Sequence, residues 1–374
     1  MTFGAPRTIV LVITQLDPGG AERALAQLAL RLDRQKFRPI VISLRARPVV
    51  GRAFLVETLE AAGIPVEFLN ARHKWELPRA VWRLRRRLRA VRPVAVQSFL
   101  FHANVVAALA GKWAGVPVVA GVRVADPIRS RQRAERWLAP LISRFVCVSQ
   151  SVADFCEQTA GIAREKLVVI PNGVDVEKFA HAQPVDRAAL PVPAGRRLLI
   201  AIGRLEKQKG HDWLLPVLAR AFPQLPEHDL LLVGDGPEQA RLQQQAGELG
   251  IASRVHFLGW RGDIPALLRA AELLLLPSRW EGMPNVLLEA MAAGLPVLTT
   301  RVEGTTEILG PLAPEQSVPA GDAAAFERAL VSLASDAARS VDLGQQNRAR
   351  VLASFSLAFS VQAYEQIYME LMKS

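Results

Sequence analysis

Residues 273–294 combine a short apolar run, a polar loop and a helical segment, and this combination restricts the fold more than any other stretch. Leu273–Leu276 has the length and composition of a buried strand in a parallel sheet, and Pro277 ends it. Good helix formers follow from Asn285 until Gly294, which suits a C-terminal cap. This order predicts an α/β domain, in which ligands bind beyond the carboxyl ends of the strands.

The loop and the helix of this stretch each carry a glutamate, Glu281 and Glu289, with seven residues between them. Ionised carboxylates accept hydrogen bonds from hydroxyl groups, and a helix N-terminus offers free N–H groups to a phosphate. The pair therefore suits a ligand with many hydroxyls and a phosphate. A solvated loop glutamate and an ordinary helix-start glutamate explain the same residues equally well.

The rest of the chain repeats the alternation of short apolar runs and helical segments, which predicts mostly parallel sheets covered by helices. A length of 374 residues suggests two domains. The net charge of +11 favours anionic partners such as nucleotide phosphates, anionic lipids or nucleic acid. Cys147 and Cys156 have no metal or redox spacing, and we see no secretory signal or convincing membrane span, so a cytoplasmic location is expected.

Three further places could contact a ligand. Gly19 and Gly20 lie at a strand-to-helix turn, where they either form only the turn or let a phosphate approach the backbone. Arg204 and Lys209 follow the strand-like run Leu198–Ile202 and are either solvated charges or a clamp for a diphosphate. His102 precedes a helix of small residues, where a lone histidine is more often structural.

The stretch from Arg79 to Arg92 contains seven arginines and apolar residues at steps of three and four. Such a basic amphipathic helix can lie on an anionic membrane or pack on its own sheet with a solvated arginine face. A second basic cluster, Arg123, Arg129, Arg131, Arg133 and Arg136, favours the membrane. We therefore expect peripheral attachment to the inner face of the membrane through the first domain.

Ser278-Arg279-Trp280-Glu281-Gly282-Met283-Pro284-Asn285 followed by Glu289 resembles the glutamate-x7-glutamate motif of glycosyltransferase family four. Further parts of the chain resemble the same family: Gly203-Arg204-Leu205 with Lys209-Gly210, Gly19-Gly20-Ala21-Glu22-Arg23, and His102-Ala103-Asn104. Related sequences often have histidines where Gln97 and Phe99 stand here.

The resemblance implies a GT-B fold, with two doubly wound Rossmann-like domains that face each other across a cleft. The expected division is an acceptor-side domain at 1–180, a nucleotide-sugar domain at 181–355, and a helix at 356–374 that crosses back to the first domain. It also implies residue roles: Glu281 at the transferred sugar, Gly282 in the donor-binding site, Glu289 at the ribose, Arg204 and Lys209 at the diphosphate, Gly19 and Gly20 at the donor phosphate, and His102 at the sugar.

By this resemblance the protein is a retaining glycosyltransferase of the hexosyltransferase type. It would move a sugar from a nucleotide diphosphate sugar, with a UDP-sugar favoured, to a lipid-linked or cell-envelope glycan acceptor. The chain has no Asp-x-Asp pair that would hold a divalent ion, so we expect transfer without metal, with Arg204 and Lys209 supplying the positive charge, and no further cofactor.

Two other functions remain open at this point. A nucleotide-sugar 2-epimerase has the same two-domain build and would invert a sugar carbon without any acceptor. A basic nucleic-acid-binding protein would use the same arginines, although only 6% of the residues are aromatic and no nucleic-acid module is recognisable.

Overall fold

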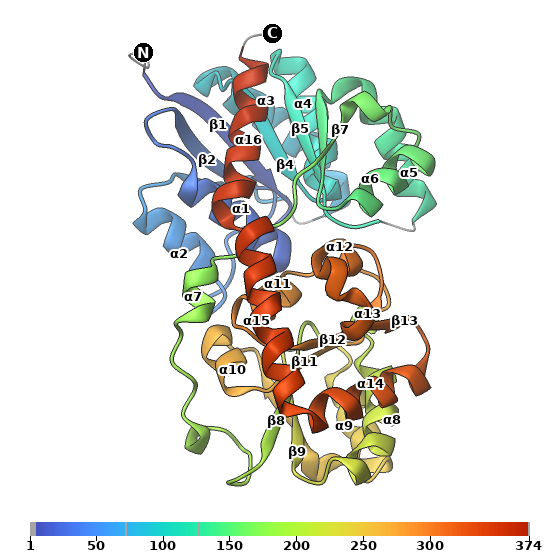
Figure 1. Cartoon of the computed structure of the whole chain (residues 1–374). Coiled ribbons are helices and arrows are strands. Elements are labelled where there is room, and N and C mark those ends of the chain that lie inside the picture. The colour runs from blue at the N-terminus through green and yellow to red at the C-terminus, as the bar shows by residue number, and fades with distance from the viewer. Residues whose placement is uncertain (1–4, 72, 126–127, 373–374) are drawn as a thin grey trace. The chain divides into compact units, whose positions relative to one another are not determined.

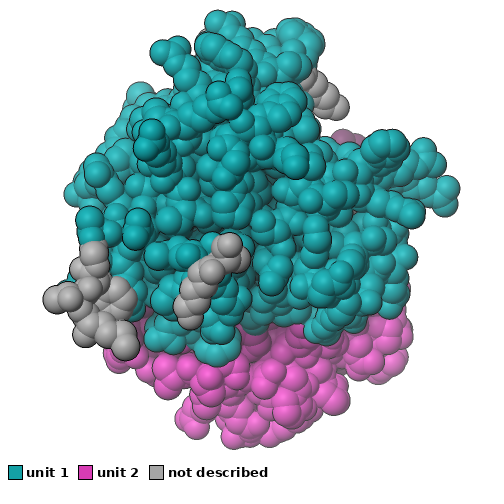
Figure 2. All heavy atoms as spheres, turned by 90° about the horizontal axis from the view of Figure 1, so that it is seen from above, with its two compact units in different colours: residues 1–173, 357–374 teal, residues 174–356 magenta. Residues whose placement is uncertain are grey.

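The structure is a computed structural model that describes residues 5–71, 73–125 and 128–372 (Figure 1). The chain packs as two compact units, which Figure 2 colours separately. Unit 1 contains Met1–Gly173 and Leu357–Ser374, and unit 2 contains Val174–Ser356. The chain thus leaves unit 1 shortly before the boundary expected at 180 and returns to it with the last helix.

Among the described residues, unit 1 forms a seven-stranded parallel sheet in the order β3-β2-β1-β4-β5-β6-β7. Its strands are β1 Arg7–Ile13, β2 Phe37–Ser43, β3 Val66–Phe68, β4 Ala95–Phe99, β5 Val118–Val122, β6 Arg144–Cys147 and β7 Leu167–Val169. Its helices are α1 Gly20–Arg31, α2 Phe54–Ala61, α3 Leu77–Val91, α4 Phe101–Ala114, α5 Arg129–Leu138, α6 Gln150–Gln158 and α16 Leu357–Leu371.

Unit 2, which is described throughout, forms a six-stranded parallel sheet in the order β10-β9-β8-β11-β12-β13. Its strands are β8 Arg197–Ile202, β9 His228–Val233, β10 Val255–Gly259, β11 Leu273–Leu276, β12 Val297–Arg301 and β13 Ser317–Pro319. Its helices are α7 Val176–Ala180, α8 His211–Ala221, α9 Gln239–Glu248, α10 Ile264–Ala270, α11 Asn285–Ala292, α12 Thr305–Leu309, α13 Ala313–Gln316, α14 Ala323–Ser335 and α15 Ala337–Ser354. The two parallel sheets confirm the predicted fold class.

The last helix, α16, completes the core of unit 1. Val361, Tyr364, Ile367 and Tyr368 lie in one buried cluster with β1 and α1. The rings of Tyr368 and Phe37 meet edge to face with centroids 5.8 Å apart. Large buried aromatic side chains therefore build the last segment of the chain into the first unit, where α16 lies beside α1 (Figure 1).

The arginine-rich helix α3 packs on unit 1 through its apolar face. Val81, Leu84 and Leu88 are at most 3% exposed, and α3 packs along α4. The apolar face of α3 therefore packs in the interior of unit 1, as one of the two interpretations of this helix expected. It is not available to a membrane. Among the described residues, no helix is both long enough and apolar enough to cross a membrane.

Helix α5 was not predicted, for a physical reason. None of its residues is buried, and its sequence is dominated by arginine and other polar residues. A helix without a buried apolar stripe leaves no periodic signal in the sequence.

Candidate active site

The residues predicted to bind the donor in unit 2 lie where the strand order reverses. From β8 the chain continues to β9 on one side, while β11 pairs with β8 on the other side. The loops after β8 and β11 therefore leave the same edge of the sheet as neighbours, which is the ligand-binding position in open α/β sheets. Hydrogen bonds join the two loops. The backbone N–H of Arg279 donates to Gln208 O at 2.8 Å, and the side-chain amide of Gln208 donates through Nε2 to Trp280 O at 2.9 Å.

A side-chain ion pair joins the same two loops. Lys209 Nζ lies 2.5 Å from Glu281 Oε1, and both side chains are largely buried, with exposures of 16% and 7%. The Ser278 hydroxyl donates to the same carboxylate oxygen at 2.7 Å. Thr300 in turn donates to Ser278 O at 2.5 Å. The structure thus brings together two predicted site residues, and it adds Ser278, which the sequence did not single out.

Two glycines let these loops touch. Gly210 has φ of 68°, and a Cβ there would lie 2.0 Å from Pro277 O. Gly304, in the loop after β12, has φ of 74°, and its Cβ would lie 2.1 Å from Gly282 O. A side chain at either position would be strained and would collide with backbone, so these close approaches require glycine. The loop after β12 is therefore a third wall of the candidate site.

The remaining predicted residues of unit 2 lie on the same two loops and on the helix that follows β11. Arg204 is exposed at the start of the β8 loop, and its guanidinium pairs with Glu206 at 3.0 Å. Gly282 is buried in the β11 loop, and Glu289 is half-buried on α11. Arg279 makes a bidentate ion pair with Asp212 at 2.8 and 2.9 Å, which lowers the pKa of that carboxyl. This second pair holds the same loops together on their exposed side.

In unit 1 the predicted residues also lie at the point where the strand order reverses. Strands β1 and β4 are neighbours, with Ile13 opposite Phe99, so the loops after them share one edge. Gly19 and Gly20 stand at the start of α1, where a Cβ on Gly19 would lie 2.3 Å from Glu22 Oε2. His102 lies in the first turn of α4, which begins at Phe101, and its ring meets the Phe101 ring edge to face.

The turn that places His102 is strained and firmly held. Leu100, directly after β4, has φ of 75° and ψ of 151°, a conformation that is rare for residues other than glycine. Buried Asn104 anchors the helix, because its amide donates to Gly121 O at 3.1 Å and it accepts from the Ser98 hydroxyl at 2.8 Å. Strain of this kind is typical of functional sites, and only the structure could reveal it.

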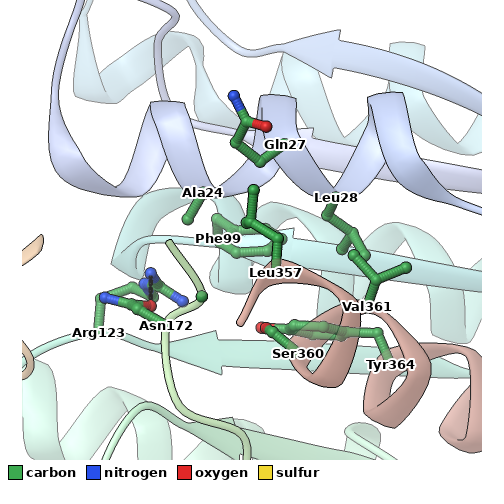
Figure 3. Close-up of a pocket in the computed structure, with 11 residues that line it drawn as sticks. Ala24, Gln27, Leu28, Phe99, Arg123, Asn172, Leu357, Ser360, Val361 and Tyr364 are labelled. Carbon is green, nitrogen blue, oxygen red and sulfur yellow. Dashed lines mark hydrogen bonds between the residues drawn. The ribbon is translucent and has the colours of Figure 1, made fainter. Parts of the chain in front are cut away.

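The structure corrects the assignment of Arg123 to the basic surface cluster. Arg123 instead lines a pocket of unit 1 with Asn172, Phe99 and Tyr364 (Figure 3). Its guanidinium donates a hydrogen bond to Asn172 Oδ1 and lies 5.4 Å from the centre of the Phe99 ring. Burial lowers the pKa of Arg123 and raises the pKa of Tyr364. Arg123 therefore ties β5 to the chain that leaves unit 1.

Among the described residues, no three His, Cys, Asp or Glu side chains gather closely enough to hold a metal ion.

Family models match both units. The model described as Glycosyltransferase Family 4 matches residues 18–178, and the model described as Glycosyl transferases group 1 matches residues 196–336. The chain belongs to the glycosyltransferases of family 4. The resemblance that the sequence motifs indicated is thereby confirmed.

Curated relatives of this glycosyltransferase act in several settings. An Escherichia coli UDP-Gal:alpha-D-GlcNAc-diphosphoundecaprenol alpha-1,3-galactosyltransferase is 27% identical over 70% of this chain and 72% of its own length. The lipopolysaccharide core biosynthesis glycosyltransferase LpsE of Rhizobium meliloti is 34% identical over about half of each chain, 49% and 53%.

Solved structures agree with this membership. The Anabaena protein HepE in complex with UDP and glucose superposes with a TM-score of 0.86 at 25% identity, over 97% of this chain and 100% of that one. WaaG, a glycosyltransferase involved in lipopolysaccharide biosynthesis, has a TM-score of 0.72 at 18% identity, over 95% and 98% of the two chains, and shows the shared fold alone. The fold class is therefore GT-B.

Proposed function

We propose that this glycosyltransferase moves a sugar, with retention of configuration, from a nucleotide diphosphate sugar to a hydroxyl of a lipid-linked or cell-envelope glycan. The observation that carries the proposal is the group formed by Lys209, Glu281 and Ser278 where the strand order of unit 2 reverses. A cation and a hydroxyl-accepting carboxylate side by side suit a ligand in which a diphosphate adjoins a sugar. A UDP-sugar is favoured, since HepE was solved with UDP, UDP-glucose, and UDP and glucose.

Each candidate residue has a role in this reaction. Lys209 directs one of its N–H groups at Glu281 and can turn the others to phosphate oxygens, while exposed Arg204 can fold over the same diphosphate. Glu281 contacts the transferred sugar, Gly282 forms part of the donor-binding site, and Glu289 contacts the ribose. On unit 1, Gly19 and Gly20 let the donor phosphate approach the backbone closely, and His102 forms a hydrogen bond with the sugar.

The transfer uses the leaving diphosphate in place of a covalent nucleophile. The diphosphate departs on the face where the acceptor hydroxyl attacks and helps to take the hydroxyl proton. Arg204 and Lys209 stabilise the negative charge that develops on the leaving oxygen, which is the role of a divalent ion in other transferases. We therefore propose transfer without metal.

The acceptor is proposed to be lipid-linked or a glycan of the cell envelope. The support is that the Escherichia coli relative acts on a sugar carried by diphosphoundecaprenol, and the Rhizobium meliloti relative acts in lipopolysaccharide core biosynthesis. A lipid-linked acceptor would bring the enzyme to the inner face of the membrane as a peripheral protein.

Calorimetric titration with UDP, GDP and ADP in metal-free buffer tests the donor site. We expect UDP to be the one nucleotide that binds. The Arg204→Ala, Lys209→Ala double variant should have a roughly hundredfold or more lower affinity for UDP, because two charge-assisted hydrogen-bond donors are lost. The control is Arg220→Ala, Arg328→Ala, which removes two exposed charges from α8 and α14 and should bind normally. Absence of binding for all three nucleotides, or equal loss in both variants, would refute the donor site.

A further inference from the structure

Nearly all of the excess positive charge of the chain is concentrated on three neighbouring helices of unit 1. Helices α3, α4 and α5 together hold eleven Lys and Arg and one carboxylate, Glu135, in a chain of net charge +11. Helix α4 packs against both α3 and α5. The three helices therefore form one continuous and strongly cationic surface, the arginine–tryptophan surface, whose members are Arg79, Trp82, Arg86, Arg89, Lys112, Trp113, Arg129, Arg133, Arg136 and Trp137.

On α3 the exposed members follow one line along the helix. Arg79, Trp82, Arg86 and Arg89 recur at steps of three and four, opposite the buried apolar stripe. The Trp82 side chain is 54% exposed, and the Arg86 guanidinium lies 5.9 Å from its ring centroid. A large aromatic side chain thus remains in water, flanked by cations.

Helix α5 presents the same pattern. Arg129, Arg133 and Trp137 follow one another at steps of four, and Trp137 is 84% exposed. The helix is attached from its other side, where the Arg131 guanidinium lies 5.4 Å from the centre of the Phe101 ring of α4. Its outward face therefore combines two arginines with a largely exposed tryptophan.

Helix α4 connects the two patterns with a third exposed tryptophan. Trp113, near the end of α4, is 55% exposed. Its carbonyl oxygen accepts hydrogen bonds from Arg85 Nε at 3.3 Å and Arg89 Nη2 at 3.1 Å. These bonds fix the end of α4 against α3, so that Trp113 stands beside the arginines of α3.

We propose that the arginine–tryptophan surface docks this glycosyltransferase on an anionic lipid bilayer. The six arginines and Lys112 of this surface complement phosphate head groups. Tryptophan is a side chain that favours the interface between head groups and acyl chains. Docking uses the outward faces of the three helices, whereas the apolar stripe of α3 stays in the core. The proposal rests on the proposed function in one respect, because a lipid-linked acceptor lies in such a bilayer.

Vesicle sedimentation of the full chain tests the proposal without any turnover. We expect binding to vesicles of phosphatidylcholine mixed with phosphatidylglycerol, little binding to phosphatidylcholine alone, and release by salt. Two combined variants probe the surface. The first carries Trp82→Ala, Trp113→Ala and Trp137→Ala, and the second carries Arg79→Gln, Arg86→Gln, Arg129→Gln and Arg133→Gln. Each variant should lower vesicle binding at least about tenfold. The matched controls on unit 2, Trp260→Ala and Arg220→Gln, Arg328→Gln, should bind like the unchanged protein.

UDP titration of each variant shows whether it is folded and keeps the outcomes distinct. Equal binding to neutral and anionic vesicles, or unchanged binding by both surface variants, overturns the proposal. Absence of vesicle binding together with normal UDP binding overturns docking and leaves the proposed function intact. Salt-sensitive binding of single-stranded DNA without vesicle binding would assign the surface to nucleic acid and also overturn the proposal.

Discussion

Lys209 Nζ lies 2.5 Å from Glu281 Oε1, so the cation proposed for the diphosphate is paired with the carboxylate proposed for the sugar. The Ser278 hydroxyl donates to the same oxygen at 2.7 Å. Both residues of the pair are largely buried, so water screens their interaction only weakly. The charge of Glu281 therefore opposes the binding of a diphosphate while its oxygens are needed for the sugar.

The substitution Glu281→Gln should separate these two effects. Removal of the negative charge next to Lys209 should leave UDP affinity unchanged or make it up to roughly tenfold tighter. Transfer should slow roughly 10- to 100-fold, because the hydrogen bonds of the sugar to a charged acceptor are lost. Calorimetry with UDP and initial rates with the donor sugar measure the two quantities.

The matched control is Glu272→Gln, at the opposite edge of the same sheet. Glu272 precedes β11 and pairs with Arg197 at 2.6 Å, with 38% exposure. Both UDP affinity and transfer should be nearly unchanged there. Parallel weakening of UDP binding and transfer in Glu281→Gln would show that the carboxylate only supports the loops.

Gly304→Ala should destabilise the protein because its Cβ meets the backbone of the β11 loop at Gly282. Gly321→Ala has a comparable φ of 85° but open space around the Cβ, so it measures the backbone strain alone. We expect Gly304→Ala to cost roughly 1–3 kcal/mol more than Gly321→Ala in urea unfolding. It should also weaken UDP binding, since the two loops must separate. Equal unfolding free energies for the two variants would contradict the close approach.

The local pattern of the sequence was enough to predict the alternation of strands and helices that forms both parallel sheets. Strand β11 has the predicted bounds and α11 starts at the predicted residue, because an apolar run and prolines mark them locally. The family motifs likewise located Lys209 and Glu281. That these residues touch depends on the pairing of β8 with β11, which no local pattern encodes.

The sequence did not reveal those properties of a residue that depend on its surroundings in the folded protein. Arg123 was grouped with surface arginines by its neighbours in the chain, yet it faces a pocket beside Tyr364. The strained turn at Leu100 leaves no trace in composition, since leucine is an unexpected residue at positive φ. The burial of the apolar face of α3 also required the fold, because an amphipathic pattern does not identify what covers it.

Substitutions at Leu100 should reverse the usual order of alanine and glycine. Both remove the leucine side chain, but only glycine adopts φ of 75° with ψ of 151° without strain. Leu100→Gly should therefore be more stable than Leu100→Ala by roughly 1–2 kcal/mol in urea unfolding. The transfer rate of the glycine variant should still fall, because a freer turn holds His102 less firmly. A glycine variant that is the less stable of the two would refute the strain.

Transfer should continue undiminished in a chelator if Arg204 and Lys209 neutralise the leaving diphosphate. Initial rates in excess EDTA, compared with rates after adding Mg²⁺ or Mn²⁺, measure this directly. Rates within roughly twofold of each other are expected, since no step needs a divalent ion. A chelator-sensitive rate that a metal ion restores would refute metal-independent transfer.

Buried His211 should make stability fall in mild acid. It is 3% exposed, and both ring nitrogens lack a hydrogen-bond partner among the described residues. Burial, together with the charge of Lys209, lowers its pKa to about 4, whereas an unfolded histidine titrates near 6.5. As the pH falls, the histidine therefore gains its proton in the unfolded state before it does so in the folded state. The contribution of His211 to the free energy of unfolding is complete above about pH 6.5 and is lost progressively towards pH 4. The loss from this group is about 3 kcal/mol at most.

The variant His211→Leu isolates this contribution. It removes the titrating ring and its unpartnered nitrogens, so its unfolding free energy should decline less between pH 7 and pH 4.5 than that of the unchanged protein. Buried His228, whose pKa is also lowered mainly by burial, contributes in the same direction and remains in both proteins. Exposed His181→Leu is the control and should leave the pH dependence unchanged. Identical pH profiles for the His211→Leu variant and the unchanged protein in urea unfolding would show that His211 is not held neutral by burial.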